Sequence, residues 1–208
     1  IESCLTDKIA ESSFEYLKRV AKTNKLGKGE EHEGILSTLY EEINFIDKSL
    51  AAAPYLNNKK YKVKTFKVPT LIFPFGCNSS QEKAVTAAFT NQISIIQGPP
   101  GTGKTQTILN IIANILLQQK TVLVVSNNNS ATTNILDNFG FIAAALGKKE
   151  NKERFIMEQP DIPDELQEWE LNIPNSVNPK KEVIYALSIL RKAFTLQDEM
   201  ATLKQEIK

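Results

Sequence analysis

The sequence has few of the features that mark secreted or membrane proteins. Its 208 residues include only two cysteines, Cys4 and Cys77. Two cysteines are too few for a disulfide-stabilised scaffold, so we interpret both as ordinary thiols in a reducing compartment. No apolar run reaches the roughly 18 residues of a membrane span, and no signal-peptide pattern is present. We therefore expect a cytoplasmic protein with no membrane partner.

An excess of charge of one sign is also missing, because the net charge is only +1. Whole-chain electrostatics therefore give no sign of a nucleic-acid partner, and any basic surface must be local. Apolar residues make up 41% of the chain, enough for one core or one core with a satellite domain. The chain begins at Ile1 and ends within a helical pattern. We therefore expect a piece of a longer protein, whose remainder packs against the helical ends.

What the sequence does contain is a complete phosphate-binding loop. Its eight residues fit the pattern G-x-x-x-x-G-K-[ST] at every fixed position: Gly98, Pro99, Pro100, Gly101, Thr102, Gly103, Lys104 and Thr105. Glycines allow successive backbone N–H groups to face one anion, and the helix that follows adds its positive N-terminal dipole. Lys104 is then expected to reach the β- and γ-phosphates of a nucleotide, and the Thr105 hydroxyl to hold Mg²⁺.

The residues on both sides of the loop fit the context that this motif needs. Residues 93–96 form a β-branched run that predicts a strand, and apolar residues recur with helical spacing through 107–117. A chance Gly/Pro turn is a poor alternative in this context. The other predicted elements are helices at 80–90 and 131–139, a buried strand at 121–125 and a third strand at 141–146. This alternation predicts a parallel sheet covered by helices.

Two polar elements flank the loop. Gln81 lies near a helix start, and its amide offers the donor and acceptor pair that reads an adenine edge, although an exposed glutamine there often has no function. Downstream, the polar segment 126–134 follows the second predicted strand and leads into a helix. Ligands of open α/β sheets bind at such strand ends, and short uncharged donors suit nucleic-acid phosphates. A well-capped loop is an equally good interpretation of this segment.

The flanking regions carry weaker signals. Residues 1–50 show two apolar stripes typical of helices that pack together. The stretch 59–67 holds five lysines and two aromatics, which would suit a nucleic-acid backbone or, as the better-supported alternative, an edge strand protected from aggregation. Further on, Asn178 and Pro179 predict the start of a long helix that pairs with another helix, as in a coiled-coil arm.

Together these motifs resemble superfamily 1 helicases, most closely the branch that contains the nonsense-mediated-decay helicase. The matching elements are residues 78–85 (NSSQEKAV), 97–105 (QGPPGTGKT), 122–125 (VLVV) and 128–131 (NNSA). Asn128 replaces the serine that the family has at this position. The combination also resembles large bacterial AAA-domain helicase-type proteins with long helical insertions.

The resemblance implies ATP and Mg²⁺ as cofactors, with Lys104 and Thr105 as catalytic residues and Thr105 as the magnesium ligand. The residues that it assigns to cofactor binding are Gln81, which would read adenine, and Gly98, Pro99, Pro100, Gly101, Thr102, Gly103, Lys104, Thr105 and Gln106. It implies that single-stranded nucleic acid, DNA or RNA, contacts Asn128, Asn129 and Ser130. ATP binding and hydrolysis would then move two core domains along the strand.

The fold implied by the resemblance is α/β: the parallel sheet of a P-loop NTPase (RecA-like), covered by helices and here incomplete. We expect three regions along the chain. They are a helical or extended N-terminal region at 1–70, a partial nucleotide-binding core at 71–147, and a charged helical insertion or arm at 148–208.

A catalytic acid is missing from the sequence after the loop. Phosphoryl transfer needs a Walker B carboxylate for Mg²⁺ and the attacking water, and usually an arginine finger. None of the candidates follows an apolar run: Asp137, Asp161, Asp164 and Asp198. We therefore expect the ATP-dependent helicase activity in the longer protein and no ATP turnover by these residues alone. A AAA+-like ATPase acting on proteins and a nucleotide-dependent scaffold are the alternatives.

Overall fold

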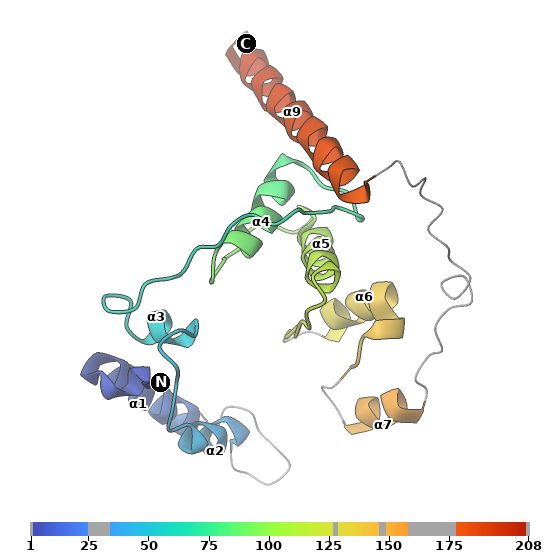
Figure 1. Ribbon diagram of the computed structural model, residues 1–208. Coiled ribbons are helices and arrows are strands. Elements are labelled where there is room, and N and C mark those ends of the chain that lie inside the picture. Colours follow the sequence, from blue (N-terminus) through green and yellow to red (C-terminus); the bar gives the residue numbers. More distant parts are fainter. Residues whose placement is uncertain (1, 25–33, 127–128, 146–148, 158–177, 207–208) are drawn as a thin grey trace. The chain divides into compact units, whose positions relative to one another are not determined.

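The computed structural model of the chain describes residues 2–24, 34–126, 129–145, 149–157 and 178–206. The chain divides into two compact units. The first unit contains residues 1–67 and 90–94, and the second contains residues 68–89 and 95–208. Helices make up most of the regular structure in the described part of both units (Figure 1).

The described part of the first unit contains the 3₁₀ turn η1 (Cys4–Thr6) and the helices α1 (Lys8–Thr23), α2 (Ile35–Glu42) and α3 (Ala52–Leu56). Helix α1 contacts both α2 and α3 (Figure 1). The rings of Phe14 and Tyr40 meet edge to face between α1 and α2, with centroids 5.8 Å apart. The buried core consists of Cys4, Ala10, Phe14, Ala53, Leu56 and Tyr61.

The first turn of α1 is capped by Asp7. Its Oδ1 accepts the backbone N–H of Ile9 at 3.1 Å and of Ala10 at 3.3 Å, which satisfies donors that a helix start leaves free. The same carboxylate accepts Nδ2 of Asn57 at 2.7 Å and Nζ of Lys60 at 2.8 Å. The hydrogen bond from Lys60 is the main cause that lowers the pKa of Asp7 to about 2. Asp7 therefore ties the segment after α3 to the start of α1.

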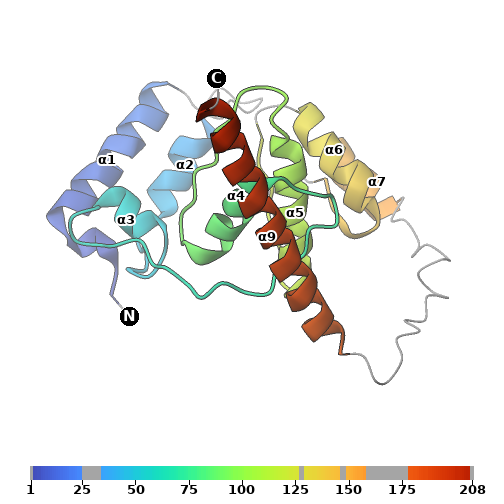
Figure 2. The same ribbon diagram turned by 90° about the horizontal axis from the view of Figure 1, so that it is seen from above.

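The described helices of the second unit are α4 (Ser79–Thr90), α5 (Lys104–Leu117), α6 (Asn129–Phe139), α7 (Lys149–Met157) and α9 (Pro179–Glu206), with the 3₁₀ turn η2 (Gly140–Ile142) after α6. Helix α5 contacts α6, and α9 runs past α4 (Figure 2). The buried residues of this unit are unusually polar for a core. They include Leu71, Gln81, Glu82, Val85, Thr107, Leu109, Asn110, Ile112 and Asn114.

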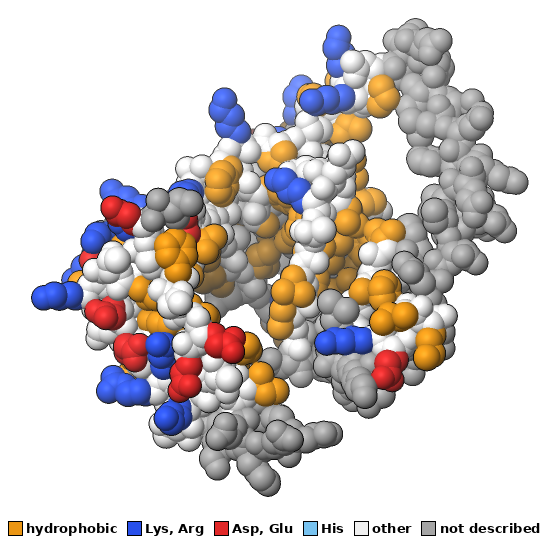
Figure 3. Space-filling view, turned by 60° about the horizontal axis from the view of Figure 1, so that its bottom comes forward, with side chains coloured by type: hydrophobic (Ala, Val, Ile, Leu, Met, Phe, Trp, Pro, Cys, Tyr) orange, Lys and Arg blue, Asp and Glu red, His pale blue; other side chains and the backbone are white. Residues whose placement is uncertain are grey.

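The predicted parallel sheet is wrong, because the described residues contain no β-strand. The predicted strands 93–96 and 121–125 carry no regular structure and form no ladder with the other described residues. Their side chains are open to solvent, with Ile95 83% and Val125 80% exposed, and Figure 3 shows hydrophobic side chains at the surface. An apolar, β-branched run indicates a preference for extended backbone. A sheet also needs a neighbouring strand, which the local sequence does not specify.

The predicted third strand at 141–146 is also wrong over its described residues. Residues 140–142 form η2, and residues 143–145 carry no regular structure. The predicted helices at 80–90, 107–117 and 131–139 are confirmed as α4, α5 and α6, and the helix from Pro179 is confirmed as α9. Among the helices that the structure describes, none combines the length and apolar character that crossing a bilayer requires.

Candidate nucleotide-binding site

The phosphate-binding loop leads from Gly98 into the first turn of α5. Gly101 and Gly103 have φ angles of +82° and +76°, a left-handed backbone that glycine adopts without steric cost. Gly103 is the N-cap of α5 and adds no side-chain hydrogen bond to the first turn. The N–H groups of an uncapped helix start, together with the helix dipole, suit an anion such as phosphate.

The Lys104 ammonium lies over its own loop. Its Nζ donates to the carbonyls of Gly98 at 2.5 Å and Pro99 at 2.7 Å, and Thr102 Oγ1 donates to the Pro99 carbonyl at 2.8 Å. Lys104 and Thr105 are both exposed on the first turn of α5. Because charge-assisted bonds to phosphate are stronger than bonds to a neutral carbonyl, a phosphate here would draw the ammonium away from the loop carbonyls.

Gln81 is buried against this loop although it is polar. Its Nε2 donates to the Gly103 carbonyl at 3.0 Å and to Gln106 Oε1 at 2.9 Å. A Cβ atom at position 103 would come closer to the Gln81 amide than real Cβ contacts allow. Because both amide hydrogens of Gln81 are used within the protein, reading an adenine edge would require this side chain to exchange a partner.

Asn78 fixes the other side of the Gln81 amide. The backbone N–H of Asn78 donates to Gln81 Oε1 at 2.9 Å, and the backbone N–H of Gln81 donates to Asn78 Oδ1 at 2.9 Å. This reciprocal pair closes the start of α4 in the manner of a capping box. The structure therefore brings together three residues that sequence reasoning had linked to the nucleotide: Gln81, Gly103 and Gln106.

A row of side-chain amides on α5 was missed by the sequence analysis. Gln106, Asn110 and Asn114 are four residues apart and share one helix face. We call them the amide ladder, and we call residues 71–76, whose backbone they bind, the strap. Gln106 Nε2 donates to the carbonyl of Phe75. Two asparagines four residues apart in the otherwise apolar segment 108–117 were the signal that could have revealed this row.

Asn110 and Asn114 complete the ladder from positions that are 0% and 1% exposed. Asn110 Oδ1 accepts the N–H of Phe75 at 3.2 Å, and its Nδ2 donates to the Gly76 carbonyl at 2.8 Å. Asn114 Oδ1 accepts the N–H of Ile72 at 2.8 Å, and its Nδ2 donates to the Ile72 carbonyl at 2.7 Å. The strap is therefore held along α5 by hydrogen bonds.

The acidic side chains near α4 are occupied by contacts with α9. Glu82 Oε1 accepts Nε and Nη2 of Arg191 at 2.9 and 2.8 Å. Asp198 Oδ2 accepts Ser79 Oγ at 3.0 Å and lies 3.4 Å from Lys83 Nζ. The described residues contain no group of three His, Cys, Asp or Glu side chains that could hold a metal ion. Among the described residues, no such group therefore lies beside the Thr105 hydroxyl, the predicted magnesium ligand.

Neither cysteine is set up as a nucleophile. Burial raises the pKa of the Cys4 thiol and of the Cys77 thiol, and the Glu82 carboxylate raises that of Cys77 further. Because the thiolate is the reactive form, both residues are kept in their inert protonated state, in line with the interpretation as ordinary thiols.

The residues predicted to contact nucleic acid are not fully described. Asn128 lies outside the described residues, and so do the side chains of Asn129 and Ser130, although α6 begins at Asn129. At the other end of α6, the Phe139 ring meets Phe75 of the strap edge to face, with centroids 5.7 Å apart. The strap thus contacts both the loop helix α5 and the helix that carries the predicted nucleic-acid residues.

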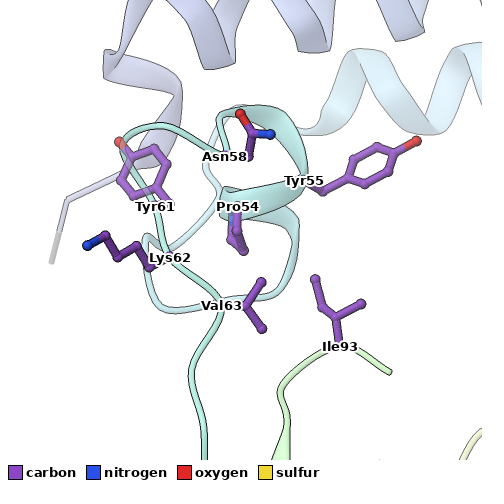
Figure 4. Close-up of a pocket in the computed structure, with 7 residues that line it drawn as sticks. All are labelled: Pro54, Tyr55, Asn58, Tyr61, Lys62, Val63 and Ile93. Atoms are coloured by element: carbon purple, nitrogen blue, oxygen red, sulfur yellow. The ribbon is translucent and has the colours of Figure 1, made fainter. Parts of the chain in front are cut away.

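A second candidate site is a hollow of about 450 Å³ in the first unit (Figure 4). It is lined by Pro54, Tyr55, Asn58, Tyr61, Lys62, Val63 and Ile93. Figure 4 shows Val63 and Ile93 facing each other below Pro54, with Lys62 and Tyr55 at opposite edges. Lys62 belongs to a stretch without acidic residues, since no Asp or Glu occurs between Asp47 and Glu82. Tyr55 is 76% exposed, so the hollow combines an open aromatic ring with a local excess of positive charge.

Comparison with known proteins gives the family. Residues 76–208 match the family described as AAA domain. The chain is 46% identical over 61 residues to "DNA polymerase alpha-associated DNA helicase A" of Schizosaccharomyces pombe, which covers 29% of this chain and 9% of the relative. It is 36% identical over 104 residues to "Regulator of nonsense transcripts 1" of Caenorhabditis elegans, which covers 44% of this chain and 10% of that protein.

A bacterial relative shows the same pattern. The chain is 45% identical over 60 residues to "Uncharacterized ATP-dependent helicase MG140 homolog" of Mycoplasma pneumoniae, covering 29% of this chain and 5% of the relative. The chain thus matches about a tenth or less of the length of these three relatives. No solved structure is a significant match. The resemblance to superfamily 1 helicases of the nonsense-mediated-decay branch is confirmed, and the chain belongs to the AAA domain family.

Proposed function

We propose that these residues form the ATP-binding part of an ATP-dependent nucleic-acid helicase or translocase. The observation that carries the proposal is the hydrogen bond from Gln81 to the Gly103 carbonyl, which joins the adenine-side element to the phosphate-binding loop. Names of relatives that include DNA helicase and ATP-dependent helicase support the same class. Within the chain, residues 71–147 would be the nucleotide-binding core, between an N-terminal region at 1–70 and an arm at 148–208.

The donor set of the loop fits the triphosphate of ATP. Two glycines with positive φ give the loop a left-handed backbone, and a Cβ at Gly103 would collide with the Gln81 amide that lies against the loop. Lys104 would neutralise phosphate charge, the N–H groups of the first turn of α5 would bind phosphate oxygens, and Thr105 would hold Mg²⁺. Bound ATP would supply the phosphoanhydride bond, with Mg²⁺ bridging its phosphate oxygens.

Hydrolysis is proposed to need a further acidic residue. In the part of the chain that the structure describes, Glu82 and Asp198 are engaged between α4 and α9 rather than at the loop. We therefore propose that the chain binds nucleotide without turning it over. Steady-state ATP hydrolysis by these 208 residues that disappears in Lys104→Ala would contradict this.

Single-stranded nucleic acid is the proposed partner. The residues assigned by resemblance, Asn128 to Ser130, are short and uncharged, which suits backbone phosphates. The hollow of the first unit gives independent support, because a lysine at one edge and an exposed tyrosine at the other suit a phosphate and a stacked base.

The test measures ATP and oligonucleotide binding separately. Binding of a fluorescent ATP analogue should be seen in the wild type and lost in Lys104→Ala. The matched control is Lys120→Ala, an exposed lysine that follows the turn after α5. Labelled single-stranded DNA and RNA should bind with an affinity that falls as salt rises. ATP binding without oligonucleotide binding at low salt would favour an ATPase that acts on proteins instead.

A further inference from the structure

The amide ladder and the strap run in opposite directions. The last amide, Asn114, binds Ile72, whereas Asn110 and Gln106, about one and two helical turns earlier, bind Phe75 and Gly76. Between these two anchors the strap turns, because the Gly76 N–H donates to the Phe73 carbonyl at 2.9 Å. Amides spaced about one turn apart on one helix face therefore bind one continuous segment toward both of its ends.

The ladder has a defined end. The next amide with this spacing is Gln118, the C-cap residue that follows α5, and its Nε2 is buried without a hydrogen-bond partner among the described residues. Asparagine is disfavoured inside helices because it competes for backbone hydrogen bonds. Apolar side chains at Asn110 and Asn114 would therefore favour the helix and the core. The Asn110 and Asn114 amides instead contribute hydrogen bonds to the strap.

The strap leads directly to the residue proposed to read the base. Gly76, at a φ of +70°, turns the chain from the strap toward Asn78, which holds the Gln81 amide. Gln106 is the branch point, because its Nε2 donates to the Phe75 carbonyl while its Oε1 accepts Gln81 Nε2. Gln81 is thus fixed relative to α5 through both of its neighbours.

We infer that the amide ladder sets nucleobase specificity by fixing the position of Gln81 relative to the phosphate-binding loop. This inference rests on the proposed function, in which the loop takes ATP. Gln106, Asn110 and Asn114 act as positioning residues, since they hold the strap and Gln81 rather than the phosphates. Loss of the ladder should therefore impair recognition of the base and leave recognition of the triphosphate intact.

The experiment compares three probes on the 208-residue chain: ATP, GTP and inorganic tripolyphosphate, each displacing a fluorescent ATP analogue. The variants are Gln106→Met and Asn110→Leu, which keep side-chain size and remove the hydrogen bonds. ATP affinity should fall about tenfold, while the affinities for GTP and tripolyphosphate stay within about twofold. Gln118→Met is the matched control, because Gln118 is an amide at the C-cap of α5 and outside the ladder. It should keep the wild-type preference for ATP.

Each result has one meaning. An equal loss for all three probes would overturn the inference, because a purely structural ladder would damage the loop as a whole. If Asn110→Leu does not fold, as judged by circular dichroism, Gln106→Met at its half-buried position still decides the question. Gln81→Met distinguishes base reading by Gln81 from the positioning role of the ladder. If it abolishes the ATP preference and the ladder variants do not, the ladder inference alone fails. A wild type without any ATP preference would overturn base reading and the ladder together.

Discussion

The side chain of Asn114 pairs with Ile72 as a neighbouring strand would. Its Oδ1 accepts the Ile72 N–H at 2.8 Å and its Nδ2 donates to the Ile72 carbonyl at 2.7 Å, so one amide satisfies both backbone groups of one residue. Asn114 also donates to the Asn110 carbonyl at 2.8 Å within α5. A helix side chain therefore gives the strap hydrogen bonds that a sheet would otherwise provide, in a unit whose described residues form no strand.

Asn114→Leu is expected to lower the free energy of unfolding of the second unit. The substitution keeps the shape of the side chain but leaves the N–H and carbonyl of Ile72 without partners, a loss of about 1–3 kcal/mol. Asn138→Leu is the matched control, since Asn138 is an exposed helical asparagine whose side chain donates to the Asn134 carbonyl within the same helix. Its effect should stay within about 0.5 kcal/mol. Urea denaturation followed by circular dichroism measures both values.

Gly103→Ala is expected to weaken nucleotide binding more than Gly101→Ala. Both residues have positive φ, so alanine costs about 1 kcal/mol of backbone strain at either position. At Gly103 the new methyl group also meets the Gln81 amide, whereas at Gly101 nothing lies within 4 Å. The difference in nucleotide affinity between the two variants therefore measures the effect of the contact with Gln81.

The control for these glycine variants is Gly140→Ala, where the added methyl group meets nothing within 4 Å and φ is not positive. It should leave the binding of a fluorescent ATP analogue unchanged. Equal losses of binding for Gly101→Ala and Gly103→Ala would show that strain alone matters and that the Gln81 contact does not.

The sequence predicted local features of this molecule better than pairings between distant segments. The starts of α4 and α9 follow from short-range signals. At α9 the signal is Asn178 before Pro179, and Asn178 Oδ1 accepts the N–H of Lys180 at 3.1 Å. The adjacency of Gln81 and the loop followed from a motif resemblance. The sheet failed because the runs at 93–96 and 121–125 specify extended backbone but not a neighbour.

The buried face of α5 shows why part of the site was missed. Ile108 is one of the apolar residues with helical spacing in 107–117, yet it is 40% exposed, while Asn110 and Asn114 are buried. A count of hydrophobic positions treats asparagine as a surface residue, although a buried amide is stable when its donor and acceptor are both satisfied. The partners that satisfy it lie in the strap, more than 30 residues earlier in the chain, where no local pattern reveals them.

Arg191→Met is expected to loosen α9 from α4. The Glu82 side chain is only 11% exposed. Removal of the Arg191 guanidinium therefore leaves a poorly hydrated carboxylate that still accepts the Thr86 hydroxyl. Because Arg191 itself is 44% exposed, water screens the pair and the loss should be about 1 kcal/mol. That corresponds to roughly fivefold faster amide exchange in α9 when local opening controls the rate.

Lys192→Met removes an adjacent exposed cation from the same helix and is the control for this prediction. Its exchange rates in α9 should match those of the wild type. If Arg191→Met also leaves these rates unchanged at low salt, the ion pair does not hold α9 in place.

The stability of the first unit should depend on pH through Asp7. The hydrogen bond from Lys60 is the largest cause that lowers its pKa in the folded chain from 3.8 to about 2. A group whose pKa is lowered by folding stabilises the folded state above its unfolded pKa. This contribution is therefore complete above about pH 4 and is lost as the pH falls toward 2.

Asp7→Asn tests this dependence while it retains a good N-cap for α1. The difference in unfolding free energy between wild type and variant should shrink as the pH falls from about 4 to about 2. Lys60→Met should move the loss of the Asp7 stabilisation to higher pH, because the main cause of the lowered Asp7 pKa is gone. A difference between wild type and Asp7→Asn that stays constant over this range would contradict the assignment. Denaturation curves at fixed ionic strength supply the values.

Lys62→Glu is expected to weaken single-stranded oligonucleotide binding and to reduce its salt dependence. Lys62 lines the hollow of the first unit, and each lysine that contacts a phosphate adds about one unit to the slope of log affinity against log salt. Tyr55→Ala should cost about 1–3 kcal/mol of binding free energy if the exposed ring stacks on a base, with a nearly unchanged salt slope.

The controls for this last prediction are Lys22→Glu on α1, which reverses a charge in the same unit, and Tyr185→Ala on α9, which removes a ring that is 64% exposed. Both should bind labelled oligonucleotide like the wild type in fluorescence anisotropy. The charge control matters because Lys22→Glu and Lys62→Glu change the net charge equally. An equal effect would mean long-range attraction, whereas a larger effect of Lys62→Glu places a phosphate at the hollow. If neither Lys62→Glu nor Tyr55→Ala changes binding, the lysines of residues 59–67 serve as a solvated edge.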